Sequence, residues 1–145
     1  MIDVADLVAR LSDKSVEAPP WVDVKEISDL STLDISRSGV RGVTLFVFYQ
    51  GERAAADVRG SGPYLQTVTQ TIGVLIVAKV VNDNKFDFKP VRQKLRERLF
   101  GWSPNADYEP FWLGEGRLMN VQKGQVTWLD NFLTEYTEDQ NRYGS

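Results

Sequence analysis

The sequence predicts an α+β domain in which two helices pack on a mainly antiparallel sheet that ends in a C-terminal β-hairpin. Two segments, 4–11 and 87–100, repeat apolar residues at helical spacing. Two others, 40–49 and 74–81, are apolar on both alternating faces, as in strands of a sheet that is covered on both sides. A chain of 145 residues has the usual size of one domain, so we predict a single domain over residues 1–145.

The first predicted helix is short and amphipathic. Val4, Leu7 and Leu11 form its apolar stripe, and charged residues occupy the other faces. A Pro-Pro pair then ends the helical pattern. We predict a short strand over residues 21–27, followed by a surface loop over the polar residues 28–39.

The two central strands place apolar side chains on both of their faces. Phe46 and Phe48 point to one face, and Leu45, Val47 and Tyr49 point to the other. Two helices cover only one face if they pack together. The other face then needs the C-terminal hairpin or a neighbouring subunit, because large exposed apolar patches are unusual in monomers. We therefore expect the chain to associate with copies of itself.

The connection between these strands is predicted to be a long, mobile hairpin loop. Residues 51–63 are small and polar and include glycines, and loops of that length in compact domains are often functional.

The second half of the chain is predicted to contain a helix and a hairpin. Leu95 and Leu99 belong to the apolar stripe of the helix, and Gly101 fits the left-handed position after its last turn. Strands at 118–122 and 125–136 flank a Lys-Gly turn. We expect residues 137–145 to form a flexible tail.

The composition lacks the usual equipment of an active site. The chain contains no histidine and no cysteine, which removes the commonest general base and the thiol and imidazole metal ligands. Its carboxylates leave open a carboxylate-dependent enzyme or a ligand-binding domain, but no spacing brings two acids together. We therefore predict a non-catalytic protein with no cofactor and no metal.

Charge and hydropathy exclude two further classes of partner. The formal charge of -3 argues against non-specific binding to nucleic acid. The longest apolar stretch, 73–81, contains Lys79 and is far shorter than the roughly 20 residues of a membrane-spanning helix. The acidic N-terminus also lacks the pattern of an export signal. We expect no membrane association.

The second helix is basic on both sides of its apolar stripe. A helical wheel places Arg92 and Arg96 on one flank and Lys94 and Arg98 on the other. A face that tracks DNA would be continuous, so the split favours ion pairs within the chain or between subunits.

One aromatic pair is a candidate interface anchor. Phe111 and Trp112 follow a proline at a junction between loop and strand, and aromatic residues are enriched at interfaces. Trp102 and Trp128 are better explained as core residues.

The second half of the chain also carries a family resemblance. A helix ends in a Leu-x-Gly-Trp step, a loop containing proline follows, and a strand begins near a Gly-Arg-Leu step before a closing strand pair. The residues concerned are Leu99, Gly101, Trp102, Pro104, Gly116, Arg117, Leu118 and Trp128. This pattern resembles the tail terminator and tail completion proteins of tailed bacteriophages, over residues 40–136. Another neck or tail subunit, such as a stopper, is the alternative.

The resemblance implies a structural virion protein of the tail or neck, assembled in the host cytoplasm. Such proteins form a homo-oligomeric ring, usually a hexamer, that caps the tail tube, ends its polymerisation and meets the head-completion or neck proteins. DNA passes through the ring without specific binding, and no cofactor is needed. The residues that we expect at assembly interfaces are Gly51, Glu52, Arg53, Asp57, Arg59, Arg92, Arg96, Phe111 and Trp112.

Overall fold

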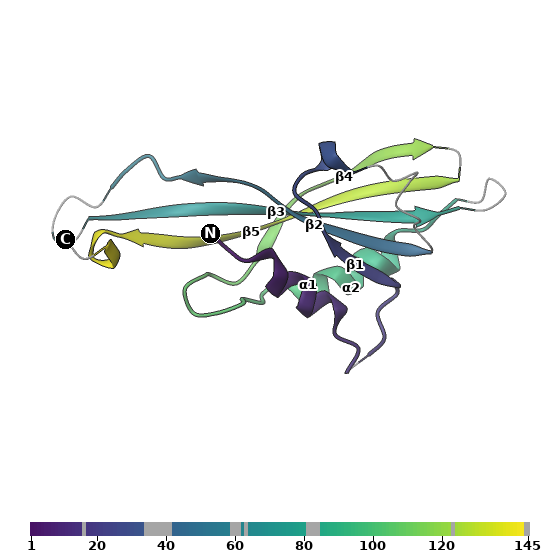
Figure 1. Cartoon of the computed structure of the whole chain (residues 1–145), viewed down its shortest axis with the longest axis horizontal. Coiled ribbons are helices and arrows are strands. Elements are labelled where there is room, and N and C mark those ends of the chain that lie inside the picture. The colour runs from purple at the N-terminus through teal and green to yellow at the C-terminus, as the bar shows by residue number, and fades with distance from the viewer. Residues whose placement is uncertain are drawn as a thin grey trace.

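A computed structural model of the chain confirms the predicted α+β class (Figure 1). It describes residues 1–15, 17–33, 42–58, 62, 64–80, 85–122 and 124–143. The elements in chain order are α1 (Val4–Ser12), β1 (Asp23–Glu26), the 3-10 helix η1 (Leu30–Thr32), β2 (Val43–Ala54), β3 (Leu65–Lys79), α2 (Lys89–Leu99), β4 (Trp112–Gln122), β5 (Gln125–Asp139) and the 3-10 helix η2 (Gln140–Tyr143).

The strands form one five-stranded sheet in the order β1-β2-β3-β5-β4. β1 pairs with β2 in parallel, and the other three pairings are antiparallel. Both α-helices lie on the same face of the sheet, below it in Figure 1, and η1 lies on the opposite side. The sheet is therefore mixed but mainly antiparallel, with the helices segregated to one face.

Local sequence explains where each helix begins and ends. The Asp3 side chain accepts a hydrogen bond of 3.0 Å from the backbone N–H of Ala5 and so caps the start of α1. Pro90 lies in the first turn of α2, where its missing N–H has no intrahelical partner to lose. Gly101 follows α2 with φ of 79°, as predicted, because a residue without a Cβ adopts this conformation at little cost.

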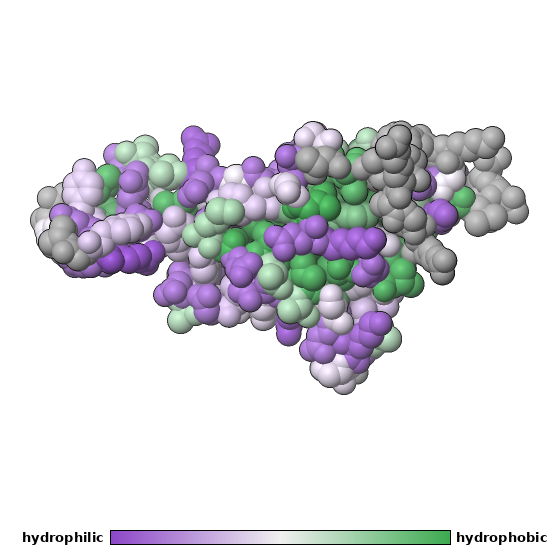
Figure 2. Space-filling model, in the orientation of Figure 1, coloured by the Kyte–Doolittle hydropathy of each residue, from purple (hydrophilic) through white to green (hydrophobic). Residues whose placement is uncertain are grey.

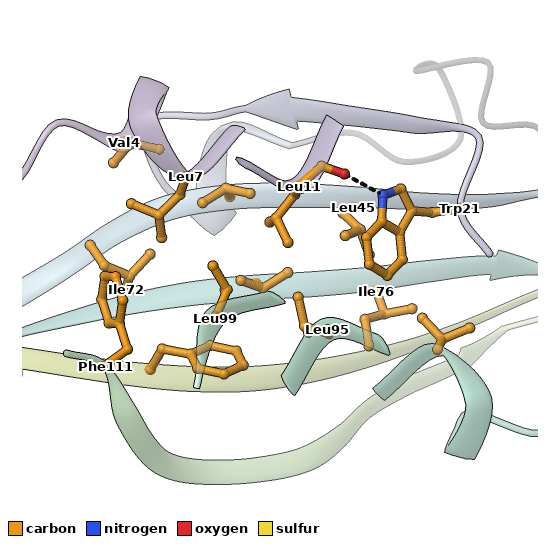
Figure 3. Packing of buried hydrophobic residues seen from close by; sticks show 14 of the residues in the cluster. Val4, Leu7, Leu11, Trp21, Leu45, Ile72, Ile76, Leu95, Leu99 and Phe111 are labelled. Atoms are coloured by element: carbon orange, nitrogen blue, oxygen red, sulfur yellow. Dashed lines mark hydrogen bonds between the residues drawn. The ribbon is translucent and has the colours of Figure 1, made fainter. Parts of the chain in front are cut away.

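The main core lies between the helices and the sheet (Figure 3). The indole N–H of Trp21 donates to the carbonyl oxygen of Leu11 at 2.9 Å, which ties the segment after α1 to the end of that helix. Leucines of both helices and alternate residues of β2, β3 and β5 meet there. The buried members are Ile2, Val4, Leu7, Leu11, Trp21, Leu45, Val47, Ile72, Val74, Ile76, Val91, Leu95, Leu99, Phe111 and Phe132.

The opposite face of the sheet holds a second, smaller cluster. Its buried members are Phe46, Phe48, Leu75, Val77 and Leu129. The expected division of β2 into two apolar faces is therefore confirmed.

The segment that covers this second face corrects the sequence prediction. Ile27, Leu30 and Leu33 pack against the cluster, although we expected 28–39 to be a surface loop. Leu30 and Leu33 lie three residues apart across the 3-10 turn η1, a spacing that places side chains on one side of the turn, and Ile27 is held beside β2 by its bond to Val47. Residues 34–39 lie outside the described part of the chain. Among the described residues, this segment provides the cover that we had assigned to the hairpin or to another subunit.

The central strands are longer than their apolar parts. Residues 51–54, expected in a mobile loop, extend β2 and pair with β3, and β3 itself begins at Leu65. Residues 137–139, expected in a flexible tail, extend β5, and η2 continues regular structure to Tyr143. The sequence prediction was wrong here because polar residues pair through their backbones as readily as apolar ones do.

These extensions project beyond the helices as a three-stranded ribbon, towards the left in Figure 1. We call this ribbon the arm and define it as residues 50–54 of β2, 65–71 of β3 and 133–139 of β5. Two of its strands continue the register of the core, because β3 and β5 pair without a shift from Leu65–Asp139 to Lys79–Gln125. The pairing of β2 with β3 shifts once, between Tyr49 and Gly51, where the arm begins. The arm is thus a direct extension of the core sheet.

The packing of α2 on the sheet gives a test of the core. Replacing Leu95, which is fully buried, with alanine should lower the free energy of unfolding by about 2–5 kcal/mol, because it removes buried methyl groups and leaves a cavity. Phe100, 58% exposed, is the matched control, and its replacement should cost about 0.5 kcal/mol or less. Chemical denaturation measures both values, and equal losses would contradict the observed packing of the helix.

Candidate assembly surfaces

Arg92 of α2 is bound within its own chain. Its guanidinium donates to both carboxylate oxygens of Asp130, with N–O distances of 2.9 and 3.0 Å. It also lies over the ring of Trp128, 4.4 Å from the centroid, and the indole N–H of Trp128 donates to Asp130 at 3.0 Å. The Asp130 side chain is only 6% exposed, so this bidentate pair holds α2 against β5 and leaves little of the carboxylate for a partner.

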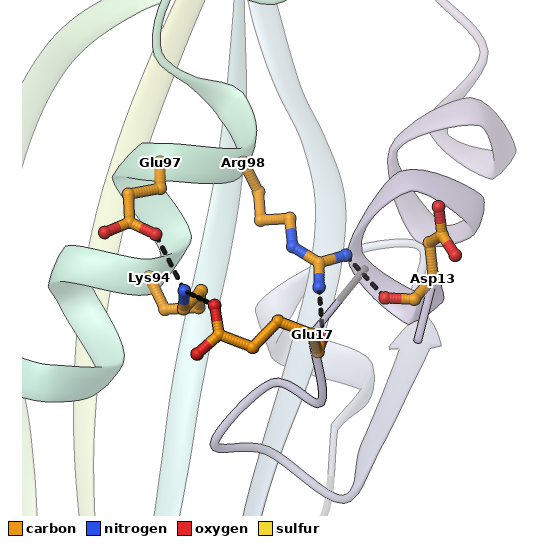
Figure 4. Close-up of polar contacts among 5 residues, drawn as sticks. All are labelled: Asp13, Glu17, Lys94, Glu97 and Arg98. Atoms are coloured by element: carbon orange, nitrogen blue, oxygen red, sulfur yellow. Dashed lines mark hydrogen bonds and ion pairs between the residues drawn. The ribbon is translucent and has the colours of Figure 1, made fainter. Parts of the chain in front are cut away.

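Lys94 and Arg98, on the other flank of α2, hold the segment that follows α1 (Figure 4). Arg98 donates to the carbonyl oxygens of Arg10, Asp13 and Glu17 at 3.0, 2.6 and 2.9 Å. These carbonyls belong to the end of α1 and the turn beyond it, where a helix leaves acceptors unpaired. Arg98 therefore acts as a cap supplied by another helix.

Lys94 completes this junction with two ion pairs. Its ammonium lies 2.7 Å from a carboxylate oxygen of Glu17 and 2.8 Å from one of Glu97. The hydrogen bond from Lys94 holds the pKa of Glu17 below its usual value, and the hydrogen bonds to Glu17 and Glu97 raise the pKa of Lys94. The split basic helix is therefore explained largely by contacts inside the chain.

Arg96 differs from these neighbours. Its side chain is exposed, and within the described part of the chain it makes no ion pair. Of the two arginines predicted at an interface from this helix, Arg92 is engaged in a structural pair and Arg96 is accessible. The role of Arg96 in assembly stays a prediction.

The aromatic pair is divided between core and surface. Phe111 is 1% exposed and stacks on Trp102 with ring centroids 6.2 Å apart, so its side chain belongs to the core of its own chain, and its part in an interface stays a prediction. The burial arises because the backbone of Phe111 pairs with the chain just after α2, through Gly101 and Trp102. Trp112 is half-buried at the start of β4 and stays a candidate.

The remaining candidates lie on the arm or beside it. Gly51, Glu52 and Arg53 pair with Thr71, Gln70 and Thr69 of β3, and the side chains of Glu52 and Arg53 are exposed. Asp57 is exposed beyond the end of β2, and Arg59 lies outside the described residues. The structure thus gathers three of these candidates on one strand.

The base of the arm is fixed by a buried amide that the sequence did not single out. The carbonyl oxygen of the Gln70 side chain accepts from the backbone N–H of Ile2 at 3.0 Å, and its amide donates to the hydroxyl of Tyr49 at 3.1 Å. Gln70 is fully buried, so its bond to Ile2 is made away from water, whereas the bond to Tyr49 is partly buried. Burial, followed by the negative charge of Glu52, raises the pKa of Tyr49 to about 12. The N-terminus and the arm are therefore joined.

A second surface that the sequence analysis missed lies on β4. This strand forms one edge of the sheet, and three of its apolar residues are unusually exposed. Leu113 is 38% exposed, Leu118 52% and Met119 37%. Their clustering on an edge strand is a signal of contact with another chain, but only the sheet order reveals that β4 is at the edge.

Two kinds of feature are absent from the segments that the structure describes. No group of three or more acidic side chains among them is arranged to hold a metal ion. No helix in the described segments is long and apolar enough to cross a membrane. The buried polar side-chain atoms of the same segments all have hydrogen-bond partners.

Arg92 and Arg96 give a matched test of the basic helix. Arg92→Ala leaves Asp130 buried without its partner and should lower the free energy of unfolding by about 3 kcal/mol. Arg96→Ala removes an exposed side chain and should change it by about 0.5 kcal/mol or less. Urea denaturation of both variants measures the difference. A stable Arg92→Ala variant would show that the pair does not hold α2 in place.

A comparison with models of known protein families gives a match over nearly the whole chain. The family model described as "Phage tail terminator protein" matches residues 1–142, from before α1 into η2. No curated protein sequence matches the chain. The match extends the resemblance noted over residues 40–136 to nearly the whole chain, and a structural family of this kind implies a non-enzymatic role. The chain therefore belongs to the phage tail terminator protein family, whose members are components of the virion tail.

Proposed function

We propose that this protein forms a closed homo-oligomeric ring, a hexamer as the resemblance implies, that caps the tail tube and ends its polymerisation. The same ring would present its other face to the head-completion or neck proteins. Family membership over residues 1–142 supports the association with the tail tube. Such a ring needs two unlike surfaces on each subunit and a head-to-tail contact that closes.

The arm is the observation that carries this proposal. It projects beyond the helices and makes the two ends of the molecule different (Figure 1). Its visible surface is mostly hydrophilic, whereas hydrophobic residues gather near the middle of the molecule (Figure 2). An extension of three paired strands has little core of its own, and its long polar surface is suited to contacts with other subunits or with the tube.

DNA would pass through the ring without specific binding. The chain has a net charge of -3, and three of the basic residues of α2 are engaged inside the chain. Arg92 binds Asp130, Lys94 binds Glu17 and Arg98 binds backbone carbonyls. A surface that grips DNA needs several unpaired cations side by side, and these contacts reduce the number available on this helix.

The connection between β2 and β3, residues 56–63, which we call the tip of the arm, is the part that we propose to contact a neighbouring tail or neck component. Replacing residues 56–63 by a short Gly-Ser link leaves the paired residues of β2 and β3 in place, so the variant should fold as the wild type does. Added to assembling tail tube protein, the wild type should limit tube length, and the variant should allow longer tubes. Negative-stain electron microscopy measures the length distribution.

Circular dichroism and thermal melting of the same variant verify that it folds. Phe100→Ala, at the end of α2 and outside the arm, serves as the control and should limit tube length normally. Normal tubes and normal joining to heads with the shortened arm would exclude this role for the tip. A wild-type protein that stays monomeric beside tail tubes, by light scattering, would contradict the ring itself.

A further inference from the structure

The outer edge of β2 is only partly covered by its own chain. β1 has four residues and pairs with β2 only from Thr44 to Val47. The last hydrogen bond on this side runs from the N–H of Ile27 to the carbonyl oxygen of Val47, at 3.0 Å. Beyond it, β2 continues to Ala54 with no described strand beside it. An unpaired edge of this kind is a ready site for another strand.

The pattern of backbone hydrogen bonds between β2 and β3 identifies the residues of β2 whose backbone groups face this free edge. In an antiparallel pair, residues point their N–H and C=O groups alternately at the partner strand and away from it. The N–H of Ala55 donates to the carbonyl oxygen of Thr67 at 2.8 Å, so the backbone groups of Ala55 point at β3. The backbone groups of Arg53, two residues earlier, point at β3 as well. Glu52 and Ala54 therefore direct their backbone groups outward, away from the sheet.

The opposite edge of the sheet is β4, and the same reasoning applies there. The N–H of Val80 donates to the carbonyl oxygen of Gly124 at 2.9 Å, just before β5 begins. Because β3 and β5 pair without a shift, the even-numbered residues of β5 also direct their backbone groups at β3. Asp130 is one of these even-numbered residues, so its backbone groups point away from β4. Its partner Gly116 therefore has backbone groups that point outward, away from β5. Gly116 has no space for a side chain, since a Cβ there would lie 2.5 Å from Asp130.

The outer edge of β4 also carries the exposed apolar residues Leu113, Leu118 and Met119. Within the part of the chain that the structure describes, two strand edges thus lack a partner strand, outer β2 and β4, and they lie at opposite sides of one sheet.

We propose that the β2 edge of one copy pairs with the β4 edge of a second copy, as antiparallel strands centred on Glu52 and Gly116. The proposal rests on the ring proposed above and specifies the contact that closes it. A second copy is the occupant because its β4 edge places an acidic residue beside a basic residue of the β2 edge. When Glu52 of one copy faces Gly116 of the next, Arg53 of the first copy lies beside Glu115 of the second. Gly51 of the first copy then lies beside Arg117 of the second.

Charge also favours this register over the register that is shifted by two residues. Shifting the strands by two residues would pair Glu52 with Leu118 and place Arg53 directly opposite Arg117. Like charges at directly opposed positions destabilise a strand pair, whereas opposite charges stabilise it. The contact joins different surfaces of the two copies, so its repetition gives a ring when the rotation closes. The five-stranded sheets then continue from one subunit to the next.

Cysteine cross-linking tests the contact directly, because the natural chain contains no cysteine. Arg53→Cys and Glu115→Cys on the same chain should form disulfides between copies and give covalent multimers on a denaturing gel. Combining Arg53→Cys with Arg96→Cys, whose side chain is exposed on α2, is the control and should give no multimers. No multimers from the test pair, or as many from the control as from the test pair, would overturn the proposal.

Charge reversal supplies an independent measurement. Arg53→Glu alone should weaken the oligomer seen by light scattering, and adding Glu115→Arg on the same chain should restore it, because the two residues meet between copies. Failure of the second change to restore the oligomer would overturn the proposed register.

A proline tests the backbone part of the contact. Glu52→Pro removes an N–H that points outward and leaves the ladder to β3 intact, whereas Glu52→Ala keeps the N–H. We expect Glu52→Pro to lose the oligomer and Glu52→Ala to retain it. A wild-type oligomer from the proline variant would contradict strand pairing. If that variant fails to fold, the cross-linking result decides.

These outcomes separate the contact from the function. A wild-type ring that limits tube length but gives no cross-link between positions 53 and 115 would refute the strand contact and leave the terminator role standing. A wild-type chain that neither oligomerises nor limits tubes would refute the proposed function itself.

Discussion

The sheet of this protein is apolar on both faces in its inner part, and most of the fold follows from the need to cover both. Leu45 and Val47 face the helices, while Phe46 and Phe48 face the opposite side. Burial of such side chains is the dominant favourable contribution to folding. The helices α1 and α2 cover one face, and the segment from Ile27 to Leu33 packs against the other. No enclosed active site is needed for this arrangement.

The polar contacts around α2 serve the same packing. Arg92 and Asp130 fix the helix to β5, and Arg98 caps the end of α1 through three carbonyl oxygens. A basic helix in a phage protein invites a reading as a DNA-binding surface. Here most of its charge is used to join helix to helix and helix to sheet, because long cationic side chains reach over an apolar seam to acceptors on neighbouring elements.

The arm is where the fold leaves its own core and where assembly is expected. β3 and β5 keep one register from the core into the arm, and β2 stays paired with β3 past a register shift between Tyr49 and Gly51, so the orientation of the arm is set by the sheet. The buried Gln70 anchors its base through a buried bond to Ile2 and a partly buried bond to Tyr49. Further out, polar side chains and an uncovered strand edge remain. A subunit of this design has surfaces that only other chains can complete, as a structural tail protein requires.

The sequence by itself determined the fold class, both α-helices, the two apolar faces of β2 and the family resemblance, because these rest on local periodicity and on short patterns. Only the tertiary structure decided that residues 51–54 and 137–139 are strands, since polar residues reveal their pairing only beside a partner. The burial of Phe111 and the pairing of Arg92 with Asp130 likewise depend on segments far apart in the chain. The order of strands in the sheet, which makes β4 and outer β2 the free edges, is a property of the whole fold.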